Sequence, residues 1–599
     1  MCGIACIFSY NSVSPRVDSN ELINISNNMH SRGPDSQGEW ISADQSIGLA
    51  HRRLSIIDTS SYGNQPMLDE SNGNRIIFNG EIYNFKQLKA ELQSNGYSFK
   101  SQTDTEVILK LYDFYGQNFV NRLRGMFAFV IWDEANKGIF AARDHFGIKP
   151  LYFSDDGKTV RFASQVKALL AGKSIDRAID PAGHVGFYLW GYVPEPFTMF
   201  KNISSLPSGN SIWIDKRGNH KQEEYFNLAS NYLQGIELGK TYPVRDCKEK
   251  LHHILLDSIK HHMIADVPLG VFLSAGLDSS TIANLAVESG KENLNTLTLG
   301  FREYEGSPDD EVILAETFSQ QLLTNQHTFR ISRDDFSDSV DHILQSMDQP
   351  SIDGVNTYFI CKAARAVGLK VALSGLGGDE MFGGYSYFSM IPKILRFSKI
   401  INCIVNDGKG FRKTTSSLFK RFNYPKLASL VEYGKDYSSA YMLCRASSLP
   451  WQIAELLDED IFLEGWQRLN TFSAIKKSIG YIDKDKIVIS ALELQWYMKG
   501  QLLRDSDWAS MAHSLEVRVP FVDIEVFRSV AELHGSGFFP NKYDMATSSI
   551  NPLPASVLNR KKTGFSIPVY AWLVPEYQTF SGNKQDYKIW QDIIYKSYC

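Results

Sequence analysis

The chain has 599 residues, more than one hydrophobic core can organise, so length predicts roughly three or four domains, with two large ones as the alternative. Hydrophobic residues make up 43% and charged residues 22%, and the formal net charge of −5 argues against a polyanion-binding surface spread over the whole molecule. The sequence shows no charged-then-apolar leader and no apolar run long enough to cross a bilayer. We therefore expect a cytoplasmic protein that binds no nucleic acid and is not stably inserted in a membrane.

Seven cysteines are scattered along the chain, and their odd number and irregular spacing predict neither a disulfide framework nor a structural zinc site. Cys2 has a chemical interpretation. Removal of Met1 would leave it with a thiol and a free α-amine on one residue, and the amine, which titrates near neutral pH, can accept the thiol proton. The sequence thus predicts a nucleophile at Cys2, although a small residue without a role is the commoner meaning of this placement.

Residues 3–8 form an apolar run that predicts a first strand, which would fix Cys2 at the end of a sheet. Further along, Asn79-Gly80 follows a second apolar run and has two interpretations. The dipeptide is typical of a hairpin turn. Alternatively, the Asn79 carboxamide and the Gly80 N–H both donate to the oxygen that becomes negative when a thiolate attacks an amide.

Residues 1–226 resemble the class II glutamine amidotransferases. The likeness rests on Cys2, Arg53, Asn79, Gly80, Asp104 and the segments 125–129 and 142–152. It implies an N-terminal-nucleophile (Ntn) hydrolase fold, an αββα sandwich, in which Cys2 attacks the glutamine carboxamide while Asn79 and the Gly80 N–H hold the oxyanion. It further implies that Arg53 pairs with the glutamine α-carboxylate and that Glu81 and Asp104 receive its α-ammonium. Gln165 departs from the family, which usually has glutamate there.

A change of pattern after the polar residues 215–224 predicts a domain boundary. We expect a first domain over residues 1–226, a linker over residues 227–240 and a second domain over residues 241–599. The second domain combines long helical segments with apolar strands, as α/β proteins do.

Residues 268–273 predict an apolar strand, residues 274–280 a turn of small residues, and a helix follows from about Thr281. Unpaired N–H groups and the helix dipole meet at such a turn and form a cradle for phosphate. An ordinary strand–helix turn capped by serine is the plain alternative. A second strand, residues 369–373, runs into the glycine-rich residues 374–385, which indicates backbone pressed against a ligand.

These segments resemble the pyrophosphate loop (PP-loop) of ATP pyrophosphatases, and glutamine-hydrolysing asparagine synthetases in particular. The resemblance implies an adenine-nucleotide α-hydrolase-like domain with a parallel sheet, which uses ATP and Mg²⁺ to activate a carboxylate acceptor as an acyl-adenylate. It implies pyrophosphate ligands at Ser274, Gly276, Ser279 and Ser280, Mg²⁺ carboxylates at Asp278 and Asp379, nucleoside contacts at Leu273, Leu299 and Gly375, and a charge-neutralising lysine at Lys562. Residues 507–512 and 516–523 complete the family pattern as scaffold.

Both halves working together would need a passage for ammonia. Glutamine bound near Cys2 releases ammonia, which water would convert to ammonium, whereas an apolar channel keeps it neutral. The resemblance therefore implies a channel between the domains.

Two positions depart from the asparagine synthetases. Ala275 replaces a second glycine, and if that position needs positive φ the methyl group costs about 1–2 kcal/mol. Leu376 stands where those enzymes commonly carry an acidic side chain facing the acceptor, and leucine cannot contact an amino group. This makes aspartate a less secure acceptor, and the neighbouring residues 349–358 look more like the asparagine-synthetase-like enzymes of surface-polysaccharide (O-antigen) biosynthesis, which implies a sugar uronic acid.

Three other functions remain open at this point. Intramolecular ring closure, as in the β-lactam synthetases, is disfavoured because those enzymes typically lack a working glutaminase. RNA thiolation is disfavoured by the net charge, and a non-catalytic glutamine or nucleotide sensor should have lost Cys2 or Asp278. The sequence leaves open whether Met1 is removed and whether the protein forms a homodimer.

The stretch from Lys393 to Lys426 is both basic and apolar. Its basic residues include Lys399, Arg412, Lys413, Lys420 and Arg421. We interpret it as a solvated helical face, with contact to a phosphate-bearing sugar carrier or a membrane surface as the alternative.

Overall fold

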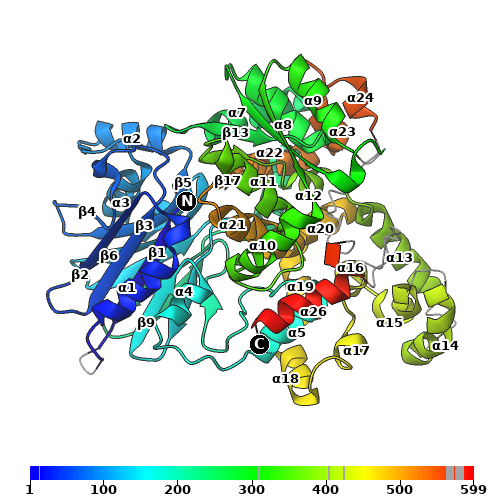
Figure 1. The fold of residues 1–599 in the computed structure, drawn as a ribbon, viewed down its shortest axis with the longest axis horizontal. Helices are drawn as coiled ribbons and strands as arrows, with labels where there is room; N and C mark the ends of the chain where they lie inside the picture. The colour runs from blue at the N-terminus through cyan, green and yellow to red at the C-terminus, as the bar shows by residue number, and fades with distance from the viewer. Residues whose placement is uncertain are drawn as a thin grey trace.

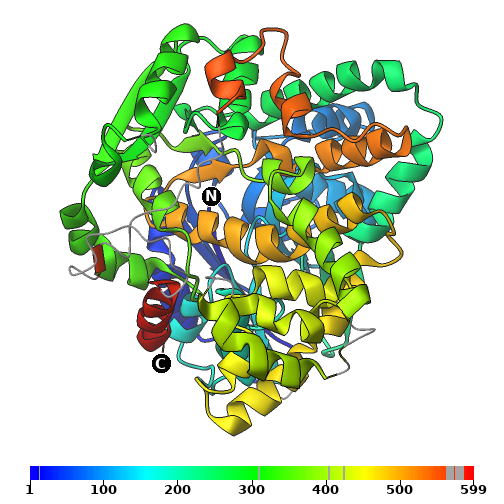
Figure 2. The same ribbon diagram turned by 90° about the vertical axis from the view of Figure 1, so that its right-hand side faces the viewer.

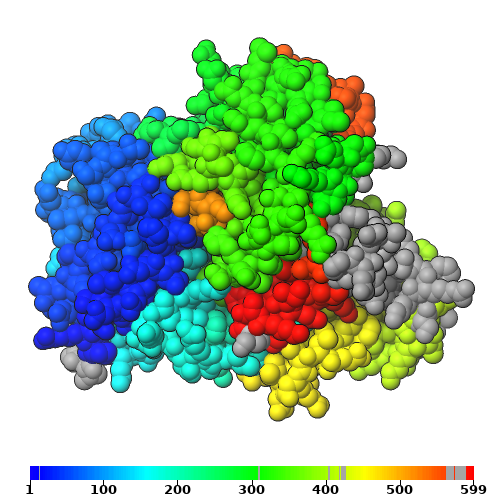
Figure 3. Space-filling view, in the orientation of Figure 1, coloured from blue at the N-terminus to red at the C-terminus, as the bar shows by residue number. Residues whose placement is uncertain are grey.

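The computed structural model describes residues 1–11, 14–307, 310–401, 405, 407–421, 425–560, 572–573 and 586–598. The amino-terminal half forms a β-sandwich, and the carboxy-terminal half surrounds a separate sheet with helices (Figure 1). The amino terminus lies between the halves, where the two are in direct contact (Figures 1 and 3).

Two antiparallel six-stranded sheets make the sandwich. The first has the order β10 (Ser204–Ser205), β8 (Tyr152–Asp155), β9 (Thr159–Ala163), β1 (Gly3–Ser9), β3 (Ile47–Arg53) and β2 (Ser36–Ile41). The second has the order β12 (His220–Glu224), β11 (Asn210–Asp215), β7 (Gly138–Arg143), β6 (Gly125–Asp133), β5 (Arg75–Ile82) and β4 (Met67–Leu68).

Alternation of side chains along β1 explains the layers. Ile4, Cys6 and Phe8 belong to the core between the sheets, whereas Ala5 and Ile7 pack in the core that includes helices α1 (Ser19–Asn28) and α4 (Val166–Ala171). Helices α2 (Phe85–Ser94) and α3 (Asp104–Tyr115) cover the other sheet with a third core. The predicted αββα sandwich is confirmed.

The Asn79-Gly80 pair does not form a hairpin turn. Both residues lie inside β5, opposite Ala128 and Phe127 of β6. A Cβ added to Gly80, which has φ of 157°, would lie 2.1 Å from the carbonyl oxygen of Met126. The turn interpretation was wrong because strand pairing continues beyond the glycine, which lets the neighbouring backbone come close.

A parallel five-stranded sheet forms the centre of the second half, as predicted. Its order is β15 (Asn325–Ile331), β14 (Asn295–Phe301), β13 (Leu269–Phe272), β16 (Val371–Leu373) and β17 (Glu516–Arg518). The predicted helix from about Thr281 begins earlier, as α8 (Leu277–Glu288), because Gly276 is its N-cap in an extended conformation. Asp278 and Ser279 therefore lie in the first helical turn.

Helices complete this half, and many of them gather below the sheet in the view of Figure 2. They are α7 (Cys247–His262), α9 (Val312–Gln321), α10 (Arg333–Ser346), α11 (Val355–Ala366), α12 (Gly378–Phe382), α13 (Tyr387–Ile401), α14 (Gly408–Arg421), α15 (Leu430–Tyr433), α16 (Tyr437–Arg445), α17 (Pro450–Ile453), α18 (Glu459–Leu469), α19 (Thr471–Ile479), α20 (Asp485–Leu492), a π-helical stretch (Glu493–Leu502), α21 (Leu503–Met511), α22 (Ile524–Gly535), α23 (Lys542–Ala546), α24 (Ala555–Leu558) and α26 (Asp586–Tyr598). None of the helices described is both long and apolar enough to span a membrane.

Residues 227–240, expected as a linker, are mostly helical. Helix α6 (Leu228–Gly239) packs on α22, and its glycines allow a close approach. A Cβ on Gly239 would lie 1.8 Å from the carbonyl oxygen of Glu532, and one on Gly235 would lie 2.6 Å from the Cβ of Ala531. The segment is therefore a helix packed against the second half. The polar residues before it had suggested a linker.

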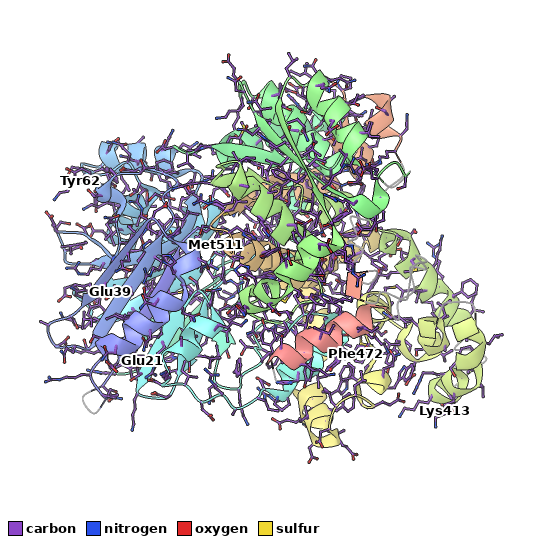
Figure 4. The ribbon with its side chains drawn as sticks, in the orientation of Figure 1. Glu21, Glu39, Tyr62, Lys413, Phe472 and Met511 are labelled. Carbon is purple, nitrogen blue, oxygen red and sulfur yellow. The ribbon has the colours of Figure 1, made fainter. Side chains whose placement is uncertain are left out.

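Buried ion pairs join the halves. Arg32 donates two hydrogen bonds, of 2.7 and 3.0 Å, to the carboxylate of Asp507 in α21. Arg124 differs, since its Nε–H is shared between both carboxylate oxygens of Asp523 at 3.1 and 2.8 Å, while its Nη1 donates to Asp257 at 2.7 Å. Met511, at the end of α21, lies at this junction in Figure 4. A bidentate guanidinium–carboxylate pair such as that of Arg32 fixes orientation as well as distance.

Candidate active sites

Cys2 lies at the start of β1, almost fully buried at the contact between the halves. Its backbone N–H donates a 2.8 Å hydrogen bond to Oδ1 of Asn79, and its sulfur is 3.9 Å from the carbonyl oxygen of Leu54. Burial raises the pKa of the Cys2 thiol, although the terminal amine lowers it in part. A buried thiol needs a nearby base to ionise, and an α-amine on the same residue would supply one.

Asn79 presents a hydrogen-bond donor next to this thiol. The residue is fully buried, and its Nδ2 has no hydrogen-bond partner within the described part of the protein. Leaving such a group unpaired costs about 1–3 kcal/mol. A carboxamide oriented by its oxygen toward the Cys2 backbone, with its N–H₂ unused, suits a ligand oxygen that carries negative charge.

Arg53 is held rigidly at the end of β3. Its Nη1 donates to the carbonyl oxygen of Ser60 at 2.7 Å and to Oδ1 of Asn64 at 3.1 Å. Gly63 makes room for the guanidinium, since a Cβ there would lie 2.0 Å from Nη2 of Arg53. Its positive charge is close enough to lower the pKa of Cys2. The structure thus brings Arg53 into the surroundings of the thiol.

Glu81 and Asp104 are two buried acids on neighbouring elements. Asp104 begins α3, and its Oδ2 accepts the Ile82 N–H at 2.9 Å. Burial raises the pKa of Asp104 to about 6 and also raises that of Glu81. Burial destabilises the ionised form of both carboxylates. A bound cation such as an α-ammonium group would offset that cost.

The second half contributes two residues to this site that sequence reasoning treated as scaffold. Glu516 on β17 accepts the Met1 amine at 3.0 Å, and Arg518 on the same strand lies 3.3 Å from Glu81. Despite burial, the terminal amine, Arg518 and Lys149 lower the pKa of Glu516 to about 2. In the sequence, only the charged residue types of Glu516 and Arg518 could have indicated a role at this site, because their partners lie hundreds of residues away.

A cavity of about 680 Å³ opens at the carboxyl ends of β13 and β16. Such an edge of a parallel sheet is the usual ligand position in α/β folds. Most of the residues predicted from the PP-loop line it, namely Leu273, Ser274, Gly276, Asp278, Ser279, Leu299, Gly375 and Asp379. Ser280 is fully buried beneath the loop and is not among the lining residues, and Lys562 lies outside the described residues.

The loop has a residue with positive φ, at Ala275, where the sequence alone could not decide whether positive φ was needed. Ala275 has φ of 52° and is fully buried. Around it, the Ser279 hydroxyl accepts the Ser274 N–H at 3.1 Å and donates to the carbonyl oxygen of Gly276 at 3.2 Å. The tight loop therefore retains its shape with alanine, at the cost of positive φ on a residue with a Cβ.

Asp278 and Asp379 converge on one point although they follow different strands. Lys542 of α23 forms ion pairs with both, at 3.1 Å from Oδ1 of Asp379. Glycines permit the approach, since a Cβ on Gly378 would lie 2.1 Å from Oδ1 of Asp278 and one on Gly384 1.9 Å from Oδ1 of Asp379. Sequence reasoning missed Lys542, which is an isolated lysine without a motif.

This pair of acids fits a divalent cation. Carboxylate oxygens beside a phosphate cradle are the donors that Mg²⁺ prefers, with substrate phosphates completing its shell. Lys542 places a positive charge between them, which shows that the position favours cations. Mg²⁺ there would be held by Asp278 and Asp379.

Leu376, Ile360, Tyr385 and Tyr497 also line the cavity. The buried Glu380 accepts a 2.7 Å hydrogen bond from the Tyr385 hydroxyl, and burial raises its pKa to about 7. Leu376 is partly exposed. These residues offer apolar and hydroxyl groups to an acceptor, with the Glu380 carboxyl among them.

A small cavity is lined by residues of both halves. Arg143 and Tyr152 come from the first half and Asp348, Arg504 and Asp505 from the second, but most of the exposed lining is apolar. The apolar passage expected from the sequence stays a prediction. The two sites are also linked through the sheet, because β17 carries Glu516 and Arg518 at the first site and is hydrogen-bonded to β16, which leads into the glycine-rich loop of the second.

A buried cysteine near the amino terminus with an unused carboxamide donor, joined to a phosphate-type cradle with two acids, defines a two-site amidotransferase. Comparison with known sequence families agrees. A glutamine amidotransferase domain family matches residues 1–226, and the asparagine synthase family matches residues 250–586. The chain belongs to the glutamine-hydrolysing asparagine synthetase family and is a glutamine-dependent carbon–nitrogen ligase.

Individual relatives support this assignment. Asparagine synthetase [glutamine-hydrolyzing] 1 of Bacillus subtilis is 33% identical over 97% of this chain and 89% of its own length. Amidase chry2 of Gibberella zeae is 30% identical over 65% of this chain and 60% of its own. A solved glutamine phosphoribosylpyrophosphate amidotransferase from Bacillus subtilis covers 55% of this chain and 81% of its own with 14% identity, but its TM-score of 0.29 is too low to bear on the fold.

Proposed function

We propose that the protein transfers the amide nitrogen of glutamine to a carboxylate other than free aspartate, with a sugar uronic acid as the first candidate. Residues 1–226 would act as the glutaminase and residues 241–599 as the ATP-dependent synthetase. The observation that carries the choice of acceptor is Leu376, which lines the same cavity as Tyr385 and Tyr497. An α-ammonium group would find no carboxylate at the Leu376 position, whereas a sugar could use tyrosine rings and hydroxyl groups.

In the first half-reaction the Cys2 thiolate attacks the glutamine carboxamide carbon, and the oxygen becomes negative. The unused Nδ2 of Asn79 and the Gly80 N–H would stabilise that oxygen. The C–N bond then breaks, ammonia leaves, and water releases glutamate from the thioester. Arg53 would hold the α-carboxylate of glutamine, while Glu81 and Asp104 would receive its α-ammonium.

In the second half-reaction the acceptor carboxylate attacks the α-phosphate of ATP. The bond between the α and β phosphates breaks, and an acyl-adenylate and pyrophosphate form. Ser274, Gly276, Ser279 and Lys542 surround the space that pyrophosphate would take, and bound Mg²⁺ would neutralise phosphate charge at Asp278 and Asp379. Ammonia then attacks the acyl carbon, AMP leaves with the bonding electrons, and loss of a proton gives the amide.

Glutamine-dependent AMP production across a panel of carboxylates tests this proposal. The panel includes aspartate and nucleotide-linked uronic acids at equal concentrations, with the amide product identified by mass. We expect kcat/KM for a uronic acid to exceed that for aspartate by at least about 100-fold, which corresponds to about 3 kcal/mol of discrimination. Efficient asparagine formation at low aspartate would overturn the choice of acceptor.

Matched variants separate the acceptor from the chemistry. Leu376→Glu should raise activity with aspartate and lower it with the uronic acid, while Leu376→Met should leave the preference unchanged because it keeps an apolar side chain of similar volume. Asp278→Ala should stop AMP production with every acceptor. If Leu376→Glu and Leu376→Met behave alike, Leu376 does not select the acceptor.

A further inference from the structure

Helix α13 exposes apolar and basic side chains on one face. Phe397 and Ile400 are 64% and 63% exposed, and Lys393, Arg396 and Lys399 are exposed among them. With 100° between successive helical residues, Lys393, Phe397 and Ile400 lie along one stripe, and Arg396 and Lys399 lie next to it on one side. We call these five residues the basic–apolar face.

Packing among the described residues does not account for the exposure of Phe397 and Ile400. The opposite side of α13 is the one that is buried, through Ile391, Ile394 and Ser398. A surface helix with one buried side normally presents polar residues to water on the other. Large exposed apolar side chains rimmed by charge instead mark an interaction site.

The surrounding charge is strongly positive, in contrast with the protein as a whole. Residues 387–421 contain eight lysines and arginines and one acidic residue, whereas the whole chain carries a formal charge of −5. Arg412 pairs with Glu432 at 2.9 Å, but no carboxylate of the described part lies within ion-pair distance of Lys393, Arg396, Lys409 or Lys413. Lys413, on α14, lies at the outer edge of the molecule in Figure 4.

We propose that the basic–apolar face attaches the protein to the surface of an anionic bilayer. Basic side chains would meet the lipid phosphates, and Phe397 and Ile400 would enter between the headgroups. The exposed aromatic and aliphatic groups favour a membrane over a nucleic acid, which would need only the charge. Attachment is peripheral, through one side of a helix that remains docked on the protein by its other side.

The position of the helix gives attachment a consequence. Helix α13 begins at Tyr387, two residues after Tyr385, which lines the cavity. Its 15 residues extend over about 22 Å at 1.5 Å per residue. Attachment along α13 would therefore bring the cavity near the membrane surface.

Co-sedimentation of the full-length protein with vesicles tests the proposal. Phosphatidylcholine vesicles with phosphatidylglycerol are compared with phosphatidylcholine alone, at low and high salt. We expect binding only to the anionic vesicles, weakened by salt because the charges are exposed. Absence of binding to anionic vesicles at low salt would overturn the proposal.

Two double variants separate charge from apolar contact. Lys393→Glu with Arg396→Glu should weaken binding more than tenfold, since each basic residue near an anionic surface contributes about fivefold. Phe397→Ser with Ile400→Ser should weaken it about tenfold or more through lost apolar burial. An undiminished rate of glutamine hydrolysis in each variant shows that it has folded, because neither active site contains these residues.

Matched controls change exposed basic or large apolar residues elsewhere on the surface. Lys216→Glu with Arg217→Glu alters exposed charge at the turn between β11 and β12, and Leu323→Ser with Tyr481→Ser removes side chains that are 87% and 93% exposed. Both controls should bind vesicles as the wild type does. Equal losses in the control and test variants, or binding of RNA through the basic–apolar face without binding of vesicles, would overturn the proposal.

Discussion

The amino group of Met1 lies 3.0 Å from a carboxylate oxygen of Glu516, 515 residues further along the chain. Glu516 belongs to β17, which pairs with the strand leading into the ATP-type cavity. The start of the glutaminase half is therefore anchored in the sheet of the synthetase half. Removal of Met1 would make the α-amine of Cys2 the new terminal amine. This amine would lie in a site where Glu516 already accepts a positive charge.

An N-terminal extension should abolish glutamine hydrolysis. With residues fused before Met1, Cys2 keeps its thiol but has no free α-amine to accept the proton, and the buried space beside Glu516 cannot hold a longer chain. Ammonia-dependent amide formation should persist. N-terminal mass analysis of the unfused protein should show Cys2 as the first residue, and an extended protein that hydrolyses glutamine at the normal rate would contradict this prediction.

Asn79→Asp should lower kcat for glutamine hydrolysis by about 10²–10³-fold, the usual effect of removing one oxyanion donor. The variant keeps an oxygen for the Cys2 backbone N–H but loses the unused Nδ2 donor. Asn84→Asp is the matched control, since Asn84 bonds to backbone groups of Arg122 and Arg124. Steady-state kinetics that show equal losses in the two variants would exclude the oxyanion role.

Asp104→Asn should stabilise the protein above neutral pH while raising KM for glutamine. Burial raises the pKa of Asp104 from 3.8 to about 6, so the folded state holds this proton more tightly than the unfolded state. The wild type therefore loses stability as pH rises from about 4 to 6, and the full cost, roughly 2–3 kcal/mol, is present above that window. The amide has no charge to bury.

Urea unfolding at pH 5 and pH 8 measures this effect. The stability gained by Asp104→Asn should be larger at pH 8, where the wild-type carboxylate is ionised. Asp176→Asn, at an exposed position, should give no such difference. A gain that is the same at both pH values would show that ionisation of Asp104 is not its source.

Ala275→Gly should stabilise the protein by about 1 kcal/mol. Relief of the left-handed φ of 52° outweighs the extra freedom that glycine gives the unfolded chain. Ala283→Gly, at a buried position inside α8, should instead destabilise by about 1 kcal/mol. The two urea midpoints should move in opposite directions, and a fall in the Ala275→Gly midpoint would mean that the loop tolerates alanine without strain.

Local sequence patterns predicted most of the architecture. Alternating apolar residues determine which layer each side of β1 joins, and a strand followed by small residues located the cradle at Ser274. The start of α8 was placed too late because Gly276 caps the helix through its extended backbone, without a side-chain signal. The interpretation of Asn79-Gly80 as a hairpin turn was wrong because both residues pair with β6, and this pairing outweighs the local preference of the dipeptide for turns.

Contacts across long stretches of sequence account for what was missed. Lys542 reaches Asp278 from 264 residues away, and Glu516 reaches Met1 from 515 residues away. Lys542 belongs to no motif and Glu516 was predicted only as scaffold, because their roles depend on which surfaces the fold brings together. Prediction from a single sequence can therefore identify the reactive groups more readily than the charges that surround them.

The nitrogen source of Cys2→Ala tests the two-site mechanism most directly. Amide product is measured with glutamine and with ammonium chloride as alternative donors, alongside Cys6→Ala, which alters a buried thiol on the same strand. We predict that Cys2→Ala loses more than about 10³-fold of its activity with glutamine and keeps its activity with ammonium, while Cys6→Ala uses both. Continued use of glutamine by Cys2→Ala at the wild-type rate would contradict the mechanism.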